Sequence, residues 1–141
     1  MSTADPVSSN RDRVTRRGDQ GEALAADFLR GQGLAIAGRN YRCRFGEIDL
    51  VCKDQNTLVF VEVRLRGSDA FGGAAASITA GKQHKLVLAA RHYLQQLRTS
   101  PACRFDVVLL RGLRDNDIEW IRNAFGEKRI AVSLSVVSYP K

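Results

Sequence analysis

The sequence predicts a single-domain α/β protein in which a mixed sheet is flanked by helices. A chain of 141 residues is long enough to bury one core and too short for two full domains. Two segments show helical periodicity, and the segments between and after them alternate apolar and polar residues as strands do. Apolar residues make up 44% and charged residues 26% of the chain, a balance typical of a globular domain rather than a disordered one.

The chain is basic, with 22 lysines and arginines against 15 acidic residues and a formal net charge of +7. This balance favours polyanionic partners, since cationic side chains release counterions when they bind such partners. No apolar run approaches the ~20 residues that span a bilayer, and the first residues lack the apolar core of a signal peptide. We therefore expect a cytoplasmic protein with no membrane partner. The three widely spaced cysteines predict reduced thiols rather than a disulfide or a zinc site.

The N-terminal part of the chain divides into a tail and a helix. Residues 1–17 are polar and lack apolar periodicity, which predicts a flexible basic tail ahead of a single domain over residues 18–141. From Asp19, the stretch "DQGEALAADFLRGQG" repeats apolar residues at three and four positions and then ends in glycines, as a helix does. Glu22 shares the apolar stripe of this helix, so its carboxylate is predicted to face inward.

Strands and a second helix follow. Three strands, joined by short links into an antiparallel meander, are predicted at residues 34–45, 47–53 and 58–66. A helix spans about residues 79–97, and the strand at residues 104–112 returns parallel to the third strand because a helix separates the two. The stretch "DIEWIRNAF" predicts a short strand and a turn, and the residues after Gly126 fit either a last strand or a partly ordered tail.

The second and third strands carry charges where apolar residues would pack more easily. Alternation places Glu47 and Asp49 on one side of the second strand, and Glu62 and Arg64 on one side of the third. Burying an ionised carboxylate costs several kcal/mol, and neighbouring carboxylates raise one another's pKa. A divalent cation would neutralise them, and Mg²⁺ binds one or two carboxylates while leaving positions for phosphate oxygens. The alternative is that these acids lie exposed at strand ends and form surface salt bridges worth at most ~1 kcal/mol each.

The order of several sequence blocks resembles a known family. "GEIDLV", "LVFVEVRLR", "FGGAAASI", "KQHKL" and "RFDVV" follow one another within about residues 18–125, as in the YraN-like family of small bacterial proteins. That family is similar to the PD-(D/E)xK nucleases, especially to archaeal-type Holliday junction resolvases. The resemblance implies a restriction-endonuclease-like α-β-β-β-α-β core, with a Mg²⁺ or Mn²⁺ site where the second and third strands diverge.

The resemblance also assigns roles to individual residues. The nuclease motif falls on Asp49, Glu62 and Arg64, and the first-helix acid of the resolvase-like members falls on Glu22. It implies that Asp49, Glu62 and Glu22 hold the metal and that Arg64 contacts the scissile phosphate. Glu47 belongs to the same block and is either an outer ligand or a structural residue.

One residue departs from the motif, because Arg64 stands where these nucleases usually have lysine. A guanidinium stays charged and cannot act as a base, although it can clamp a phosphate. Lys82, at the start of the second helix, is therefore included among the predicted catalytic residues as an alternative source of the amine.

A track for a sugar-phosphate backbone is predicted from basic and polar residues near this site. Its members are Arg39, Arg42, Arg44, Arg66 and Lys82, and the resemblance adds Gln83, which lies where related nucleases often have a polar residue on the second helix. The alternative is a solvated charged face, since phosphate contacts require only position and charge. Tyr41 and Phe45 interleave with the arginines and either stack on bases or belong to the core. His84 and His92 are predicted to lie on the surface of the second helix rather than to act as ligands.

The predicted function is that of a metal-dependent DNA endonuclease that hydrolyses phosphodiester bonds in branched or distorted DNA. Junction cleavage needs two cuts, which would favour a two-fold homodimer. The alternative is a catalytically weak or inactive nucleic-acid-binding protein on a nuclease fold. Arg64 favours this alternative, and the retained carboxylates oppose it, since phosphate binding alone would gain from their loss. A third interpretation is a structural subunit whose acids form a salt-bridge network.

Overall fold

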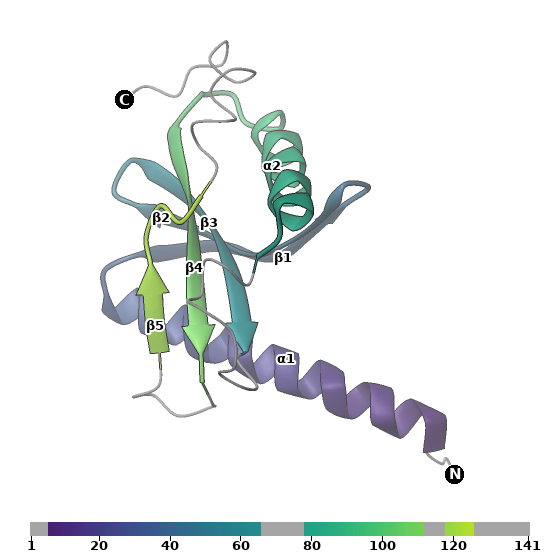
Figure 1. Ribbon diagram of the computed structural model, residues 1–141. Coiled ribbons are helices and arrows are strands. Elements are labelled where there is room, and N and C mark those ends of the chain that lie inside the picture. The colour runs from purple at the N-terminus through teal and green to yellow at the C-terminus, as the bar shows by residue number, and fades with distance from the viewer. Residues whose placement is uncertain (1–5, 66–77, 112–117, 126–141) are drawn as a thin grey trace.

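The computed structural model describes residues 6–65, 78–111 and 118–125, which form two helices and a five-stranded sheet (Figure 1). The elements are α1 (Pro6–Gly31), β1 (Ala35–Cys43), β2 (Gly46–Asp54), β3 (Thr57–Leu65), α2 (Ala80–Leu94), β4 (Ala102–Leu110) and β5 (Ile118–Ile121). The predicted α/β class and the restriction-endonuclease-like order of elements are confirmed. The segment after Gly126 lies outside the described residues, as does Arg66.

Helix α1 begins at Pro6 rather than at Asp19, so residues 6–17, predicted as a flexible tail, continue the helix instead. Proline is favourable as a first helical residue because the N–H that it lacks would have no partner in the helix. Apolar periodicity detects only the part of a helix that packs on a core. It therefore finds the second half of α1 and misses the first, which Figure 1 shows reaching beyond the sheet.

The strands follow one another across the sheet in the order β1-β2-β3-β4-β5. The pairs β1/β2 and β2/β3 are antiparallel, β3/β4 is parallel and β4/β5 is antiparallel. The predicted meander and the parallel return after the second helix are thus both confirmed. Among the described helices, none is both long and apolar enough to cross a bilayer.

Each face of the sheet is covered by one helix, so the sheet is buried on both sides. The face toward α1 packs Ala25, Ala26 and Leu29 against Leu50, Cys52, Val59, Val61, Val108 and Leu110. The opposite face packs Leu86, Val87, Ala89 and Ala90 of α2 against Ile48, Val51, Leu58, Phe60 and Phe105. A charged side chain in the middle of this sheet therefore needs a specific local environment.

The environment of the central acids arises where β2 and β3 separate. Their pairing ends at Leu50 and Val61, beyond which β2 continues to pair with β1 and β3 with β4. Asp49 and Glu62 are the first residues past this last pair. The position matches the divergence that the resemblance implies for the nuclease site.

The divergence also disturbs the alternation of side chains along β2. Ile48 packs on the α2 face and Leu50 on the α1 face, although two residues apart in a regular strand share one face. Asp49 lies between them and is directed into the opening between the strands.

A second buried acid, Asp106 on β4, lies away from this opening and fastens β5 and the turn after it. Its carboxylate accepts hydrogen bonds from the Arg104 guanidinium, from Trp120 Nε1 at 2.9 Å and from the Asn123 backbone N–H at 2.9 Å. Arg104 also bonds to Asp54 at 3.0 Å. Asp106 is fully buried and well supplied with donors, so it serves as a structural acid.

Candidate functional site

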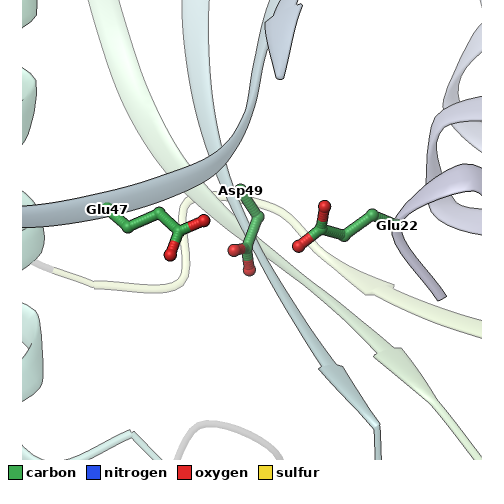
Figure 2. A group of neighbouring side chains, drawn as sticks. All are labelled: Glu22, Glu47 and Asp49. Atoms are coloured by element: carbon green, nitrogen blue, oxygen red, sulfur yellow. The ribbon is translucent and has the colours of Figure 1, made fainter. Parts of the chain in front are cut away.

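Three carboxylates meet at the divergence of β2 and β3. Glu22, Glu47 and Asp49 each offer an oxygen atom, and these oxygens all lie within 4.8 Å of one another. Figure 2 shows Asp49 in the middle, with Glu47 of the same strand on one side and Glu22 reaching in from α1 on the other. Two elements far apart in sequence therefore place acids at one point.

Asp49 bridges the gap between the separating strands. Its Oδ2 accepts a hydrogen bond of 2.8 Å from the backbone N–H of Val63 on β3. The backbone pairing of β2 with β3 has already ended at Val61, so the side chain of Asp49 takes the place of a backbone acceptor. Burial and then the charge of Glu62 raise the pKa of Asp49 to about 8, with Glu22 and Glu47 adding to the rise and the Val63 hydrogen bond opposing it. In the absence of a cation this carboxyl is therefore mostly protonated at neutral pH.

Glu22 has a raised pKa as well, first because of burial and then because of the charges of Glu47 and Asp19. A hydrogen bond from Asn40 opposes this rise. With its amide nitrogen turned toward the acids, Asn40 donates to Glu22 Oε1 at 2.9 Å and to Glu47 Oε2 at 3.1 Å. Asn40 thus links Glu22 and Glu47, two members of the carboxylate cluster formed by Glu22, Glu47 and Asp49.

Asn40 was not among the predicted site residues. It has a positive φ of 51°, a conformation that asparagine tolerates better than most residues. An asparagine inside an otherwise regular strand pattern is the only sequence signal of this role, because asparagine is a poor strand former. That signal marks an irregular backbone position and does not reveal which acids the amide contacts.

Glu62 lies beside the cluster and is paired with two cations. Its side chain is only 6% exposed, and its Oε2 lies 3.0 Å from Lys82 Nζ and 3.8 Å from an Arg64 nitrogen. Glu62, Asp49 and Glu22 were predicted as metal ligands, and Glu47 as an outer ligand or a structural residue. Glu22, Glu47 and Asp49 form the group whose oxygens lie within 4.8 Å of one another, and Glu62 is near enough for its charge to raise the pKa of Asp49.

Two hollows adjoin this site, and Asp49, Glu62 and Lys82 line both. The larger, of about 470 Å³, is also lined by Gly46, Glu47, Thr79, Gly81, Lys85 and Leu86. The smaller, of about 300 Å³, is also lined by Gly21, Glu22, Val63, Arg64, Leu65 and Leu110. The acids and their cations thus form a wall shared by two adjoining concave surfaces.

The predicted nucleic-acid-binding residues take different positions. Arg39 and Arg42 are exposed on β1, where Arg42 lies 3.5 Å from Glu47, and Arg44 is exposed in the turn after β1, where it packs over the ring of Phe45. Gln83 donates to the Ile78 carbonyl at 3.0 Å, so its amide fixes the start of α2. None of these four lines either hollow among the residues described.

Tyr41 belongs with the core, one of its two predicted alternatives. It packs on the α2 side of the sheet, and its hydroxyl bonds to His92 Nδ1 at 2.5 Å and accepts from Gln96 Nε2 at 2.6 Å. His92 is therefore half-buried and hydrogen-bonded rather than a plain surface residue, while His84 is exposed as predicted. Phe45 packs with its ring edge against His92.

Comparison with known proteins identifies relatives that match most of the chain. The sequence model of the uncharacterised protein family UPF0102 matches residues 21–110, which include every acid of the site. A UPF0102 protein of Nitrosospira multiformis is 62% identical over 77% of this chain and 92% of its own length. One from Nitrosomonas europaea is 59% identical over 79% of this chain and 94% of its own length, and one from Aeromonas hydrophila is 53% identical over 77% and 84%.

Proposed function

The chain belongs to the uncharacterised protein family UPF0102, and we propose that it is a divalent-metal-dependent DNA endonuclease that cuts branched or distorted DNA. The observation that carries the proposal is the meeting of three carboxylates, within 4.8 Å of one another, beside a buried acid that is paired with two cations. Hydrolysis of a phosphodiester needs both kinds of group in one place, because a cation site activates water and positive charges receive the phosphate.

The residues of the cluster fit a small divalent cation. Glu22, Glu47 and Asp49 offer only oxygen donors, which Mg²⁺ and Mn²⁺ prefer. Oxygens that bind one such ion at ~2.1 Å lie at most ~4.2 Å apart, so small side-chain adjustments bring the three acids to binding distance. The raised pKa values of Asp49 and Glu22 point the same way, since a bound cation would offset the burial and the repulsion that raise them.

In this proposal each residue has a distinct task. Asp49 is the central ligand, held by the Val63 N–H, and Glu22 and Glu47 flank it with their orientation fixed by Asn40. A bound Mg²⁺ or Mn²⁺ would supply an activated water and stabilise the charge that develops on the phosphate. Glu62 anchors Lys82 and Arg64, so that two positive charges stand where phosphate oxygens would arrive.

The test is a titration of Mg²⁺ and Mn²⁺ on four-way junction, flap and linear duplex DNA, comparing the wild type with Glu62→Ala and Asp49→Asn. We expect metal-dependent cleavage by the wild type and a loss of at least about 100-fold in either variant, with DNA binding retained. Asp27→Asn is the matched control, because Asp27 is an exposed acid of α1 that pairs with Arg30 outside the cluster. If the junction is preferred, its two cuts imply a two-fold dimer, which sedimentation would detect.

A second candidate function is DNA binding without cleavage. Arg64 in the place of the motif lysine favours it, because a guanidinium stays protonated at neutral pH and cannot act as a base toward water. In this case Glu62→Ala would bind the junction as well as or better than the wild type, and neither protein would cut at any metal concentration. That combination of results would reject the endonuclease proposal.

A further inference from the structure

Lys82 occupies the central position among the cations of the site. It lines both hollows, together with Asp49 and Glu62, whereas Arg64 lines only the smaller one and Lys85 only the larger one. A substrate that fills both hollows would pass over the residues common to the two, which are Asp49, Glu62 and Lys82. Lys82 is the cation among those three.

The contacts of Glu62 point to the same residue. Lys82 Nζ lies 3.0 Å from Glu62 Oε2, within the range of a charge-assisted hydrogen bond. The guanidinium of Arg64 lies farther from the same oxygen, at 3.8 Å. The Lys82 side chain is 43% exposed, whereas that of Glu62 is 6% exposed. The ammonium group of Lys82 therefore contacts a buried acid on one side and remains accessible to a ligand on the other. A group held in this way is oriented before the substrate arrives.

Helix α2 fixes the backbone of Lys82. Thr79 caps this helix, and its side-chain oxygen accepts a 3.1 Å hydrogen bond from the Lys82 backbone N–H. Lys85 follows at i+3, on the same helix face, where side chains have Cβ atoms about 5–6 Å apart. Lys85, Lys82 and Arg64 thus provide one cation in the larger hollow, one shared by both hollows and one in the smaller hollow.

We propose that a single DNA strand runs across both hollows, with Lys82 on the phosphate that is cut and with Lys85 and Arg64 on the phosphates on either side of it. This inference rests on the proposed endonuclease function and adds the path of the strand and the division of labour among three cations. Lys82 acts through its positive charge, which balances charge on the scissile phosphate. The inference requires no proton transfer by Lys82, so Lys82→Arg should retain part of the rate.

The first measurement follows binding and does not need cleavage. The affinity for a fluorescein-labelled four-way junction is measured against NaCl concentration in Ca²⁺, for wild type, Lys82→Ala, Lys85→Ala, Arg64→Ala and Lys53→Ala. Each of the first three variants should reduce the slope of log affinity against log salt by about one, because each loses one phosphate contact. Lys53 is exposed near the opposite end of β2 and outside both hollows, so its variant should keep the wild-type slope.

The second measurement separates kcat from KM in Mn²⁺. Lys82→Ala should lower kcat by at least about 100-fold, a larger factor than any rise in its KM, as expected when the lost contact is strongest in the transition state. Lys82→Arg should recover about tenfold of this loss, since it restores the charge. Lys85→Ala and Arg64→Ala should mainly raise KM. Circular dichroism on all variants identifies any that fail to fold.

The outcomes separate this inference from the proposed function. Cleavage by the wild type that persists unchanged in Lys82→Ala, or a larger kcat loss in Arg64→Ala than in Lys82→Ala, would overturn the inference and leave the endonuclease proposal standing. Cleavage by Arg64→Lys but not by the wild type would overturn this inference and the endonuclease proposal together, because the natural chain would be inactive and the strand position, not α2, would supply the working amine. Cleavage by no variant and no wild type would reject both.

Discussion

Asp49→Asn should make the metal-free protein more stable while removing its ability to bind the cation. Asparagine has the same shape as aspartate, and its side-chain oxygen can still accept the 2.8 Å hydrogen bond from the Val63 N–H. It lacks the charge that burial and Glu62 make unfavourable. The substitution therefore isolates the electrostatic cost of one acid.

The size of the effect follows from the pKa of about 8 in the folded protein against an ordinary value of 3.8. Because the folded form holds its proton more tightly than the unfolded form, the stabilising contribution of protonated Asp49 is complete below pH 4. It is lost progressively as pH rises toward 8. Between pH 5 and pH 8 this linkage amounts to about 3–4 kcal/mol at ~1.4 kcal/mol per pKa unit, and partial solvent screening reduces it to about 2 kcal/mol.

The assay is urea denaturation in EDTA at pH 5 and pH 8. The stability advantage of Asp49→Asn over the wild type should grow by about 2 kcal/mol between the two pH values, and Asp27→Asn should show no such growth. Mn²⁺ at about 100 times its Kd should then stabilise the wild type by about 2.7 kcal/mol and leave Asp49→Asn unchanged. An advantage that is the same at both pH values, or a variant less stable at both, would refute the reasoning.

Three further predictions concern the same side chains and the structural acid. Mn²⁺ affinity of the wild type should rise up to about tenfold per pH unit between pH 6 and pH 8, because Asp49 must lose its proton to bind; calorimetry in two buffers should show close to one proton released, and a pH-independent affinity would contradict the assignment. Asn40→Gly, which keeps the positive φ accessible but removes the amide, should weaken Mn²⁺ binding by about fivefold at pH 7, and an unchanged affinity would show that the amide does not organise the acids. Asp106→Ala should lower the free energy of unfolding by about 3 kcal/mol or more, since it leaves the donors around it unpaired, and a loss below about 1 kcal/mol in urea would count against that network.

The elements that pack on the core were predictable from the sequence, and those that depend on spatial proximity were not. Apolar patterning located the part of α1 that covers the sheet and the five described strands, because burial gives a helix a repeat of three to four residues and gives strands either apolar runs or a repeat of two. It missed residues 6–17 of the same helix. Regular alternation also fails between Ile48 and Leu50, where β2 leaves β3, and this local change of direction has no signature in residue types.

The candidate site shows the same limit. The motif identified Asp49 and Glu62, since their block is compact in sequence, and the resemblance added Glu22 from a helix far from them. The spacing of the motif could not show that Glu62 pairs with a lysine of α2. That pairing depends on how α2 crosses the sheet, and so does the contribution of Asn40 through a single backbone angle.

The environments of the two central acids decide between a catalytic site and a structural salt-bridge network. A structural network would give each acid a cation, as Glu62 has in Lys82 and Asp106 has in Arg104. The groups that shift the pKa of Asp49 are three acids, which raise it, and the Val63 backbone N–H, which lowers it and carries no net charge. An acid placed among acids is costly to ionise, so Asp49 is mostly protonated at neutral pH, and in the proposed site a bound cation would take the place of that proton. Neutralising Glu62 should therefore destabilise the metal-free protein, whereas neutralising Asp49 should stabilise it. Opposite signs for two neighbouring acids, measured in one denaturation experiment, would separate a site built for an added ion from a network complete in itself.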